Sequence, residues 1–268
     1  MRLAIQHTMV RGKSLVERFQ RAAEYGFAGV ELTTGGFSGS IFDHVEEIEE
    51  AMRASGLPVS SICTRKAEDL ISPDPEERAA RQENLIRLLQ LAERLGASGV
   101  VCVPIRPPAR LVDLSPVWTE EELIERLLVV TLQDIIAKTA DLDAAIFLEP
   151  LNRYEARFLR TIAQAVHIGQ SVGHRRVQVL ADFFHMNIEE ADMPNAIRSA
   201  GSRIGHVHLA DSNRLLPGHG HIDFATNLKA LRRAGFSGWM ALECGIPGDP
   251  DKTLPACVAF LRERWQQA

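Results

Sequence analysis

The sequence predicts a (β/α)8 barrel, and three observations support this fold class. Short apolar runs alternate with longer segments of helical period along all 268 residues. There are eight such runs, and eight strand and helix units suit a closed barrel of about 250 residues. No linker, low-complexity tract or break in composition divides the chain, so we expect a single domain over residues 1–268. An open, doubly wound sheet uses the same alternation and is the alternative fold.

The predicted strands are short and mostly apolar, which is typical of parallel strands that are buried on both faces. In chain order they span residues 3–6, 29–32, 59–63, 99–103, 144–148, 177–181, 204–208 and 238–242.

Residues 77–95 illustrate the predicted helices. Their apolar side chains recur at spacings of three and four, whereas the positions between them carry charges. Asp74 and Pro75 precede the segment as helix-start residues, and Gly96 follows it where a left-handed residue is favoured. Gly26, Gly56 and Gly235 follow other predicted helices in the same way, which supports helix ends at these positions.

Composition and charge exclude several classes of protein. The chain is 46% hydrophobic and 24% charged, as expected for a globular protein with a large core. Its net charge of -5 lacks the basic surplus of nucleic-acid binders. It has no apolar run of the length of a membrane span and no signal-peptide pattern, so we expect no membrane association and a cytoplasmic location.

The most informative residues follow the last four predicted strands, where Glu149, Asp182, His208 and Glu243 each stand at a strand end. The carboxyl ends of all strands in a parallel barrel open on one face, so we expect these four side chains to converge. Three carboxylates in a partly buried mouth would repel one another, whereas a divalent cation satisfies all of them. Taken singly, each residue could instead be a helix N-cap or a surface charge.

The donor set also favours a particular kind of cation. Oxygen-rich ligation with one histidine suits Mn²⁺, Mg²⁺ or Co²⁺ better than a structural zinc, which favours cysteine and more histidine. We therefore expect one divalent ion per chain, with Mn²⁺ preferred and Co²⁺, Mg²⁺ or Zn²⁺ as the other candidates.

Four segments in the second half of the chain resemble the D-tagatose/D-psicose (ketose) 3-epimerases, within the xylose isomerase-like TIM barrel superfamily of sugar phosphate isomerases and epimerases. Residues 148–155 read LEPLNRYE, residues 181–190 read ADFFHMNIEE, residues 206–214 read HVHLADSNR, and residues 217–224 read PGHGHIDF. The resemblance is strong over residues 144–245 and looser before them.

The resemblance implies the same four metal ligands, with Glu149 and Glu243 doubling as the catalytic acid and base. It further implies that His185 and Arg214 hold substrate oxygens and that Glu155 touches the first hydroxyls of a small-molecule sugar. A homodimer or homotetramer is the assembly that it implies.

The implied chemistry explains why two carboxylates and a cation belong together. Inverting a carbon beside a carbonyl requires removal of a weakly acidic C–H proton, and a fixed cation stabilises the cis-enediolate that remains. Two carboxylates on opposite faces of that carbon can take the proton and return one to the far side. Return of the proton to the neighbouring carbon would give isomerisation instead.

Several alternatives stay open. A hydroxypyruvate-type aldose-ketose isomerase or an inosose dehydratase-like lyase would use almost the same machinery. A zinc-dependent abasic-site endonuclease would need more histidine ligands and a basic face. A catalytically silent sugar-binding protein would lack one of the two glutamates.

The first half of the chain departs from the family pattern. Residues 6–8 and 103–108 lack the aromatic side chains of these epimerases, so the resemblance does not specify the sugar. His7 and Glu31 also stand at predicted strand ends, where they either line the site or pack in the core. Arg106 either binds a phosphate or carboxylate group of the substrate or is a solvent-exposed charge on a loop.

Overall fold

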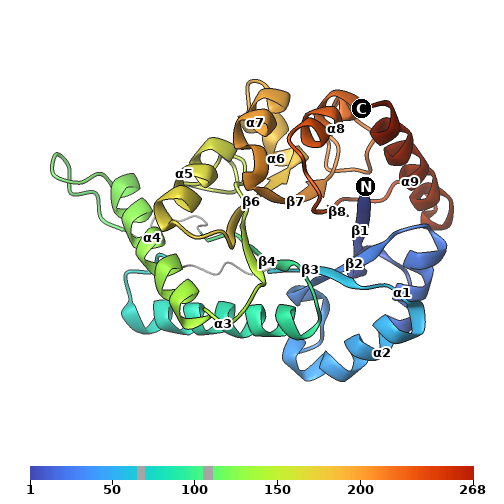
Figure 1. The fold of residues 1–268 in the computed structure, drawn as a ribbon, viewed down its shortest axis with the longest axis horizontal. Coiled ribbons are helices and arrows are strands. Elements are labelled where there is room, and N and C mark those ends of the chain that lie inside the picture. Colours follow the sequence, from blue (N-terminus) through green and yellow to red (C-terminus); the bar gives the residue numbers. More distant parts are fainter. Residues whose placement is uncertain (65–69, 105–110) are drawn as a thin grey trace.

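Eight parallel strands close into one barrel in the computed structural model, which describes residues 1–64, 70–104 and 111–268. The strands follow one another around the barrel in chain order, and the first pairs with the last to complete the circle. Helices surround the ring of strands (Figure 1). The predicted (β/α)8 barrel is therefore confirmed, and the open sheet is excluded. Arg106 and the neighbouring positions 105–108 lie outside the described residues.

The observed strands agree with the predicted ones to within one residue at each end. They are β1 (Arg2–Gln6), β2 (Gly29–Thr33), β3 (Val59–Cys63), β4 (Gly99–Cys102), β5 (Ala145–Leu148), β6 (Val177–Asp182), β7 (Ile204–Leu209) and β8 (Trp239–Leu242). The agreement is close because both faces of these strands are buried, which makes each one a distinct apolar run.

The helices are set by amphipathic pattern and by their caps. The helix expected over residues 77–95 begins and ends close to those positions, with the Asp74 side chain as its N-cap and Gly96 in the left-handed conformation just after it. The α-helices are α1 (Leu15–Glu24), α2 (Val45–Ser55), α3 (Pro75–Arg94), α4 (Glu120–Lys138), α5 (Ile162–Val172), α6 (Phe183–Glu189), α7 (Met193–Ala200), α8 (Phe224–Arg233) and α9 (Pro250–Gln267). Short 3-10 turns are η1 (His7–Met9), η2 (Thr34–Gly36), η3 (Ile41–His44) and η4 (Gly201–Arg203).

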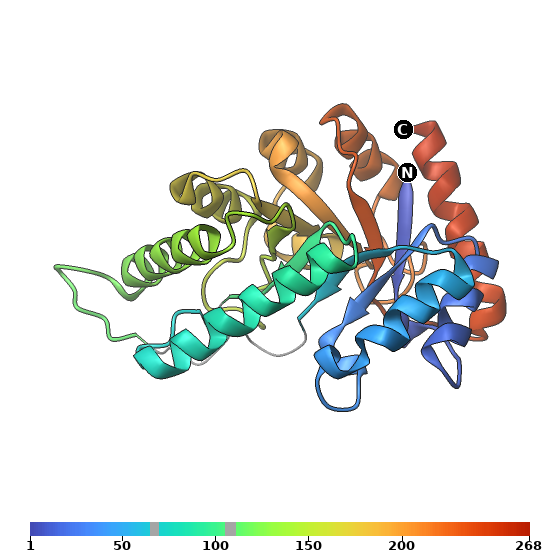
Figure 2. The same cartoon turned by 60° about the horizontal axis from the view of Figure 1, so that its bottom comes forward.

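The outer helices run along the barrel wall, and the segment before α4 projects away from the barrel (Figure 2). Within the described residues, no helix has the length and apolar character needed to cross a bilayer.

The barrel interior has two zones, because alternate residues of each strand point inward. One zone is apolar and includes Val101, Phe147 and Leu180, which form a cluster separate from the main core between strands and helices. The other zone lies nearer the carboxyl ends of the strands and holds buried polar groups such as Glu31 and His208. The polar half of the interior therefore opens toward the face on which barrel enzymes place their sites.

Gly99 provides a test of how closely the strands pack. A Cβ at Gly99 would lie 2.2 Å from the backbone oxygen of Ala145 on the neighbouring strand. We expect Gly99→Ala to destabilise the protein by about 3 kcal/mol, because a strand backbone would have to move. Gly96→Ala is the matched control. Gly96 has φ +66°, and a Cβ added there would meet no heavy atom within 4 Å beyond its chain neighbours, so the change should cost only about 1 kcal/mol. Equal losses in urea unfolding would contradict this packing argument.

Candidate metal centre and active site

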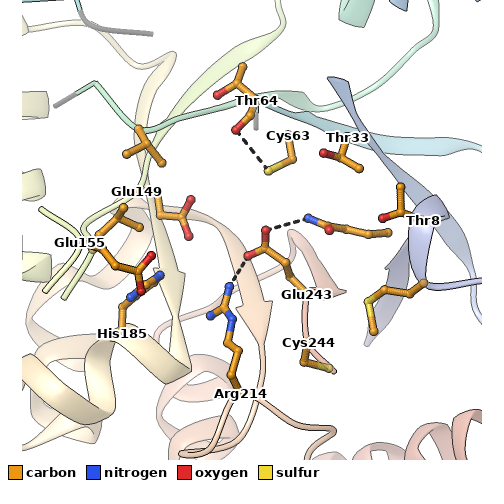
Figure 3. Close-up of a pocket in the computed structure, with 14 residues that line it drawn as sticks. Thr8, Thr33, Cys63, Thr64, Glu149, Glu155, His185, Arg214, Glu243 and Cys244 are labelled. Atoms are coloured by element: carbon orange, nitrogen blue, oxygen red, sulfur yellow. Dashed lines mark hydrogen bonds and ion pairs between the residues drawn. The ribbon is translucent and has the colours of Figure 1, made fainter. Parts of the chain in front are cut away.

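The four strand-end residues of the C-terminal half converge as their positions predicted. Glu149 follows β5, Asp182 ends β6, His208 lies near the end of β7, and Glu243 follows β8. Each offers one ligand atom, and these atoms all lie within 4.8 Å of one another. Figure 3 shows Glu149 and Glu243 reaching into the same pocket from different sides.

His208 presents its two ring nitrogens to different partners. Nε2 lies 3.0 Å from Glu31 Oε1, whereas Nδ1 faces the three carboxylates, 3.0 Å from Glu243 Oε2, 3.5 Å from Glu149 Oε1 and 3.8 Å from Asp182 Oδ2. The imidazole is fully buried, and Nδ1 makes no hydrogen bond. A buried nitrogen without a hydrogen bond, aimed at three carboxylates, is the geometry that a divalent cation would satisfy, so this donor set fits a metal ion.

Arg214 lies between two of the candidate ligands. Its Nη1 is 2.5 Å from Asp182 Oδ2, and its Nη2 is 2.5 Å from Glu243 Oε2. The guanidinium also lies 4.9 Å from the ring centre of Phe184. Arg214 therefore carries a positive charge to the wall of the cavity beside these carboxylates.

Arg214 lies in the loop after β7. Its φ is +58°, a value that few residues other than glycine adopt, so the loop holds it in an unusual backbone conformation. The buried Asp211 carboxylate accepts hydrogen bonds from the backbone N–H groups of Ser212 (2.8 Å), Gly218 (2.8 Å) and Ile222 (3.1 Å). A Cβ at Gly220 would lie 2.3 Å from Asp211 Oδ1, so the loop closes around this carboxylate. Asp211 thus holds the loop, a role that its position in the HVHLADSNR segment did not reveal.

Asn152 links His185 and Glu155, because it forms hydrogen bonds with both side chains. His185, at the start of α6, accepts a hydrogen bond at Nδ1 from the Asn152 backbone N–H at 3.2 Å and lies 2.8 Å from Asn152 Nδ2. Asn152 Nδ2 also donates to Glu155 Oε1 at 2.9 Å. The Nε2 atom of His185 is 3.9 Å from Asp182 Oδ2. The structure therefore brings both predicted substrate residues to the same wall of the site.

A cavity of about 540 Å³ lies over this cluster. Glu149, Glu155, His185, Arg214 and Glu243 line one part of it. Thr8, Thr33 and Thr64, from the N-terminal half of the barrel, line another part of it (Figure 3). These threonines were not predicted, because one hydroxyl in a loop or strand end carries no distinctive sequence signal.

The two undecided strand-end residues have different surroundings. Of the residues that the structure describes, His7 is not among those lining the cavity, and its Nδ1 accepts the Thr33 backbone N–H at 3.2 Å. Burial lowers the pKa of His7 to about 4. Glu31 is completely buried beneath the site, where it contacts His208. His7 is thus a core residue, and Glu31 is a neighbour of the candidate metal ligands.

The titratable groups of the cluster influence one another strongly. Burial raises the pKa of Glu149 above its ordinary value. Burial would also raise the pKa of Asp182, but the Arg214 charge holds that pKa below its usual range. Burial would lower the pKa of His208, but the carboxylates of Glu31 and Glu243 raise it well above the ordinary value. The carboxylates of the cluster therefore stabilise the positive charges of His208 and Arg214.

Comparison with known proteins agrees with this geometry. Residues 19–264 match the family described as xylose isomerase-like TIM barrel. A 3-dehydro-D-guloside 4-epimerase from Escherichia coli is 28% identical over 98% of this chain and 99% of its own length. A ketose 3-epimerase from Arthrobacter globiformis is 30% identical over 92% of this chain and 83% of its own length.

Solved structures give the same picture. The crystal structure of a 3-keto-D-glucoside 4-epimerase from E. coli has a TM-score of 0.83 and 27% identity, covering 98% of this chain and 99% of that one. A D-psicose 3-epimerase from Clostridium cellulolyticum has a TM-score of 0.85 at 23% identity, covering 99% of both chains, and supports the fold alone. The chain belongs to the xylose isomerase-like TIM barrel family and is an enzyme of its sugar epimerase and isomerase group.

Proposed function

We propose that this enzyme inverts a hydroxyl-bearing carbon beside the carbonyl of a keto sugar, with C3 of a free ketose as the first candidate. The observation that carries the proposal is the pair Glu149 and Glu243, which reach one centre from β5 and β8. Two carboxylates from different strands can approach opposite faces of one carbon. That arrangement is what an epimerase needs and what a one-base isomerase does not require.

Glu149, Asp182, His208 and Glu243 would hold one divalent ion, with Mn²⁺ preferred and Co²⁺, Mg²⁺ and Zn²⁺ as the other candidates. When bound, the ion would supply a fixed positive charge that makes a C–H bond beside a carbonyl more acidic. The proposal takes residues 1–268 as one domain that acts in the cytoplasm as a homodimer or homotetramer.

The proton transfers are assigned to the two glutamates. One carboxylate removes the proton from the carbon, and the substrate becomes a planar cis-enediolate. The other carboxylate then delivers a proton to the opposite face, so that the C–H bond forms again with inverted configuration. The roles exchange when the reaction runs in reverse, which is why both side chains must reach the same carbon.

The remaining residues are assigned to binding. Arg214 and His185 would donate hydrogen bonds to substrate oxygens beside the cluster, and Glu155 would accept a hydrogen bond from a hydroxyl near the carbonyl end. Each lines the cavity, and Arg214 and His185 both approach Asp182.

A second candidate is inversion at C4 of a 3-keto glycoside. It is favoured by the coverage of the E. coli 3-dehydro-D-guloside 4-epimerase, which matches 98% of this chain and 99% of its own length. A D-psicose 3-epimerase from Ruminiclostridium cellulolyticum matches 84% of this chain but 76% of its own length. Both reactions remove a proton beside a ketone, so the same two glutamates would serve either one.

The first experiment follows deuterium uptake with and without metal. After chelator treatment we expect no turnover, and Mn²⁺, Co²⁺ or Mg²⁺ should restore it. The substrates are D-fructose, D-tagatose, D-psicose, L-ribulose and a 3-keto glycoside in deuterated water, with product configuration read by NMR. Deuterium at C3 of a ketose supports the first candidate, and deuterium at C4 of the glycoside supports the second. Aldose or dehydrated products would instead indicate the isomerase or the lyase and overturn the proposal.

Single glutamate variants should separate the two proton transfers. We expect Glu149→Gln and Glu243→Gln each to lower epimerisation by about 10²–10⁴-fold, because each variant lacks one of the two bases. Each should still exchange the substrate hydrogen of one epimer with solvent deuterium, and the two variants should act on opposite epimers. Metal content is measured in parallel to confirm that the site stays loaded. Exchange of the same epimer by both variants would contradict a two-base mechanism.

Arg214→Lys tests the binding role of the guanidinium. The variant keeps the charge but loses the planar pair of donors, so kcat/KM should fall by roughly 10- to 150-fold, as for a lost hydrogen bond to a charged group. Arg175→Lys is the control, because Arg175 forms an exposed ion pair with Asp143 and should behave as wild type. Unchanged kinetics in Arg214→Lys would remove this residue from the binding site.

A further inference from the structure

Glu31 is a carboxylate inside the barrel that the proposed reaction does not use. It lies on β2, has no exposed surface, and is not among the described residues that line the cavity. A buried carboxylate costs stability unless it is fully hydrogen-bonded, so its partners indicate why the fold retains it.

Four donors from three other strands surround Glu31. Oε1 accepts from Gln6 Nε2 at 3.0 Å and from His208 Nε2 at 3.0 Å. Oε2 accepts from Ser61 Oγ at 2.7 Å and from His206 Nε2 at 2.9 Å. An ionised carboxylate has about four acceptor positions, and here all of them are taken.

Because all acceptor positions of Glu31 are taken, the contacts distinguish between two roles for it, a metal ligand or a hydrogen-bond partner of His208. Ligand atoms of Glu31, Cys63 and His208 lie within 4.8 Å of one another, so the three could be read as a second metal site. However, Glu31 has no free acceptor position left for an ion. His208 Nε2, the nitrogen on the Glu31 side of the ring, already donates to Glu31 and is occupied as well. The contacts therefore make Glu31 a partner of His208 and not a ligand.

The contact with Glu31 fixes which nitrogen of His208 carries a hydrogen. A carboxylate only accepts, so His208 Nε2 must donate, and in the neutral ring the lone pair then stands on Nδ1. Nδ1 is the atom that faces Glu149, Asp182 and Glu243. Gln6 extends the same network, because its Nε2 also donates to Glu243 Oε1 at 3.0 Å.

We propose that Glu31 is a positioning residue that sets the tautomer and ring orientation of His208, so that Nδ1 is ready to bind the cation. This inference rests on the proposed metal centre. Carboxylates that hold the outer nitrogen of a metal-binding histidine typically change metal affinity by about 10- to 100-fold. Glu31 would thus act on the centre from a strand on the far side of the barrel.

The test is a Co²⁺ titration of the full chain, followed by the ligand-field absorption of the bound ion. In Glu31→Gln the amide can donate to His208 Nε2, which leaves the hydrogen on Nδ1, where it blocks the cation. We expect the Kd for Co²⁺ to rise by about 10- to 100-fold and the absorption bands to change. Ser61→Ala is the matched control, because it removes a donor from the other oxygen of Glu31, and both readouts should stay close to wild type.

The outcomes separate the alternatives. Wild-type affinity in Glu31→Gln would overturn the positioning role, and so would weaker binding with an unchanged spectrum, since Glu31 would then contribute only charge. A wild-type protein that binds no Co²⁺ would overturn the proposed metal centre as well. Thermal unfolding of the metal-free variants checks the fold. If Glu31→Gln is unfolded, Glu31→Asp keeps the charge but withdraws it from His208, and should shift both readouts in the same direction by a smaller amount.

Discussion

The constraint on which the site depends is the burial of four carboxylates within one barrel mouth. Glu31, Glu149 and Asp182 are almost without exposed surface, and Glu243 is partly covered. Such a group cannot persist without compensating charge, because repulsion and desolvation act together. Two side chains provide it: His208 stands between Glu31 and the other three acids, and Arg214 bridges Asp182 and Glu243. A cation among the outer three would complete the same compensation.

The architecture of the barrel allows this concentration of buried charge. Inward-facing positions alternate along each strand, so the apolar packing of Phe147 and Leu180 occupies one level of the interior, and polar side chains occupy the levels nearer the mouth. Phe147 stacks on His206, with ring centres 5.2 Å apart, where the two levels meet. The hydrogen-bonded network is therefore supported from below by a rigid apolar layer, which limits how far its members can move.

The sequence predicted the fold almost completely, because parallel strands buried on both faces leave separate apolar runs. It also predicted the convergence of Glu149, Asp182, His208 and Glu243, since strand ends in a parallel barrel share one face. Asn152 and Asp211 were not predicted. Their importance arises from hydrogen bonds between segments far apart in the sequence or folded back within a loop. Glu31 was predicted at a strand end, but the structure places it in the middle of β2, where it faces His208 and does not line the cavity.

The choice between a free ketose and a keto glycoside does not depend on the two glutamates proposed as acid and base. Under this proposal, proton removal beside a ketone uses the same pair wherever the ketone lies along the sugar. The side chains that supply it come from β5 to β8, where the resemblance to ketose 3-epimerases is strong. The opposite wall includes Thr8, Thr33 and Thr64, in the half of the chain that departs from the aromatic pattern of those enzymes. Gln6, Met9, Cys63 and Val103 complete it. Hydroxyls recognise the polar parts of a sugar, whereas aromatic rings cover its apolar faces. We therefore expect a difference in substrate to arise at this wall, while the proposed chemistry is retained at the other.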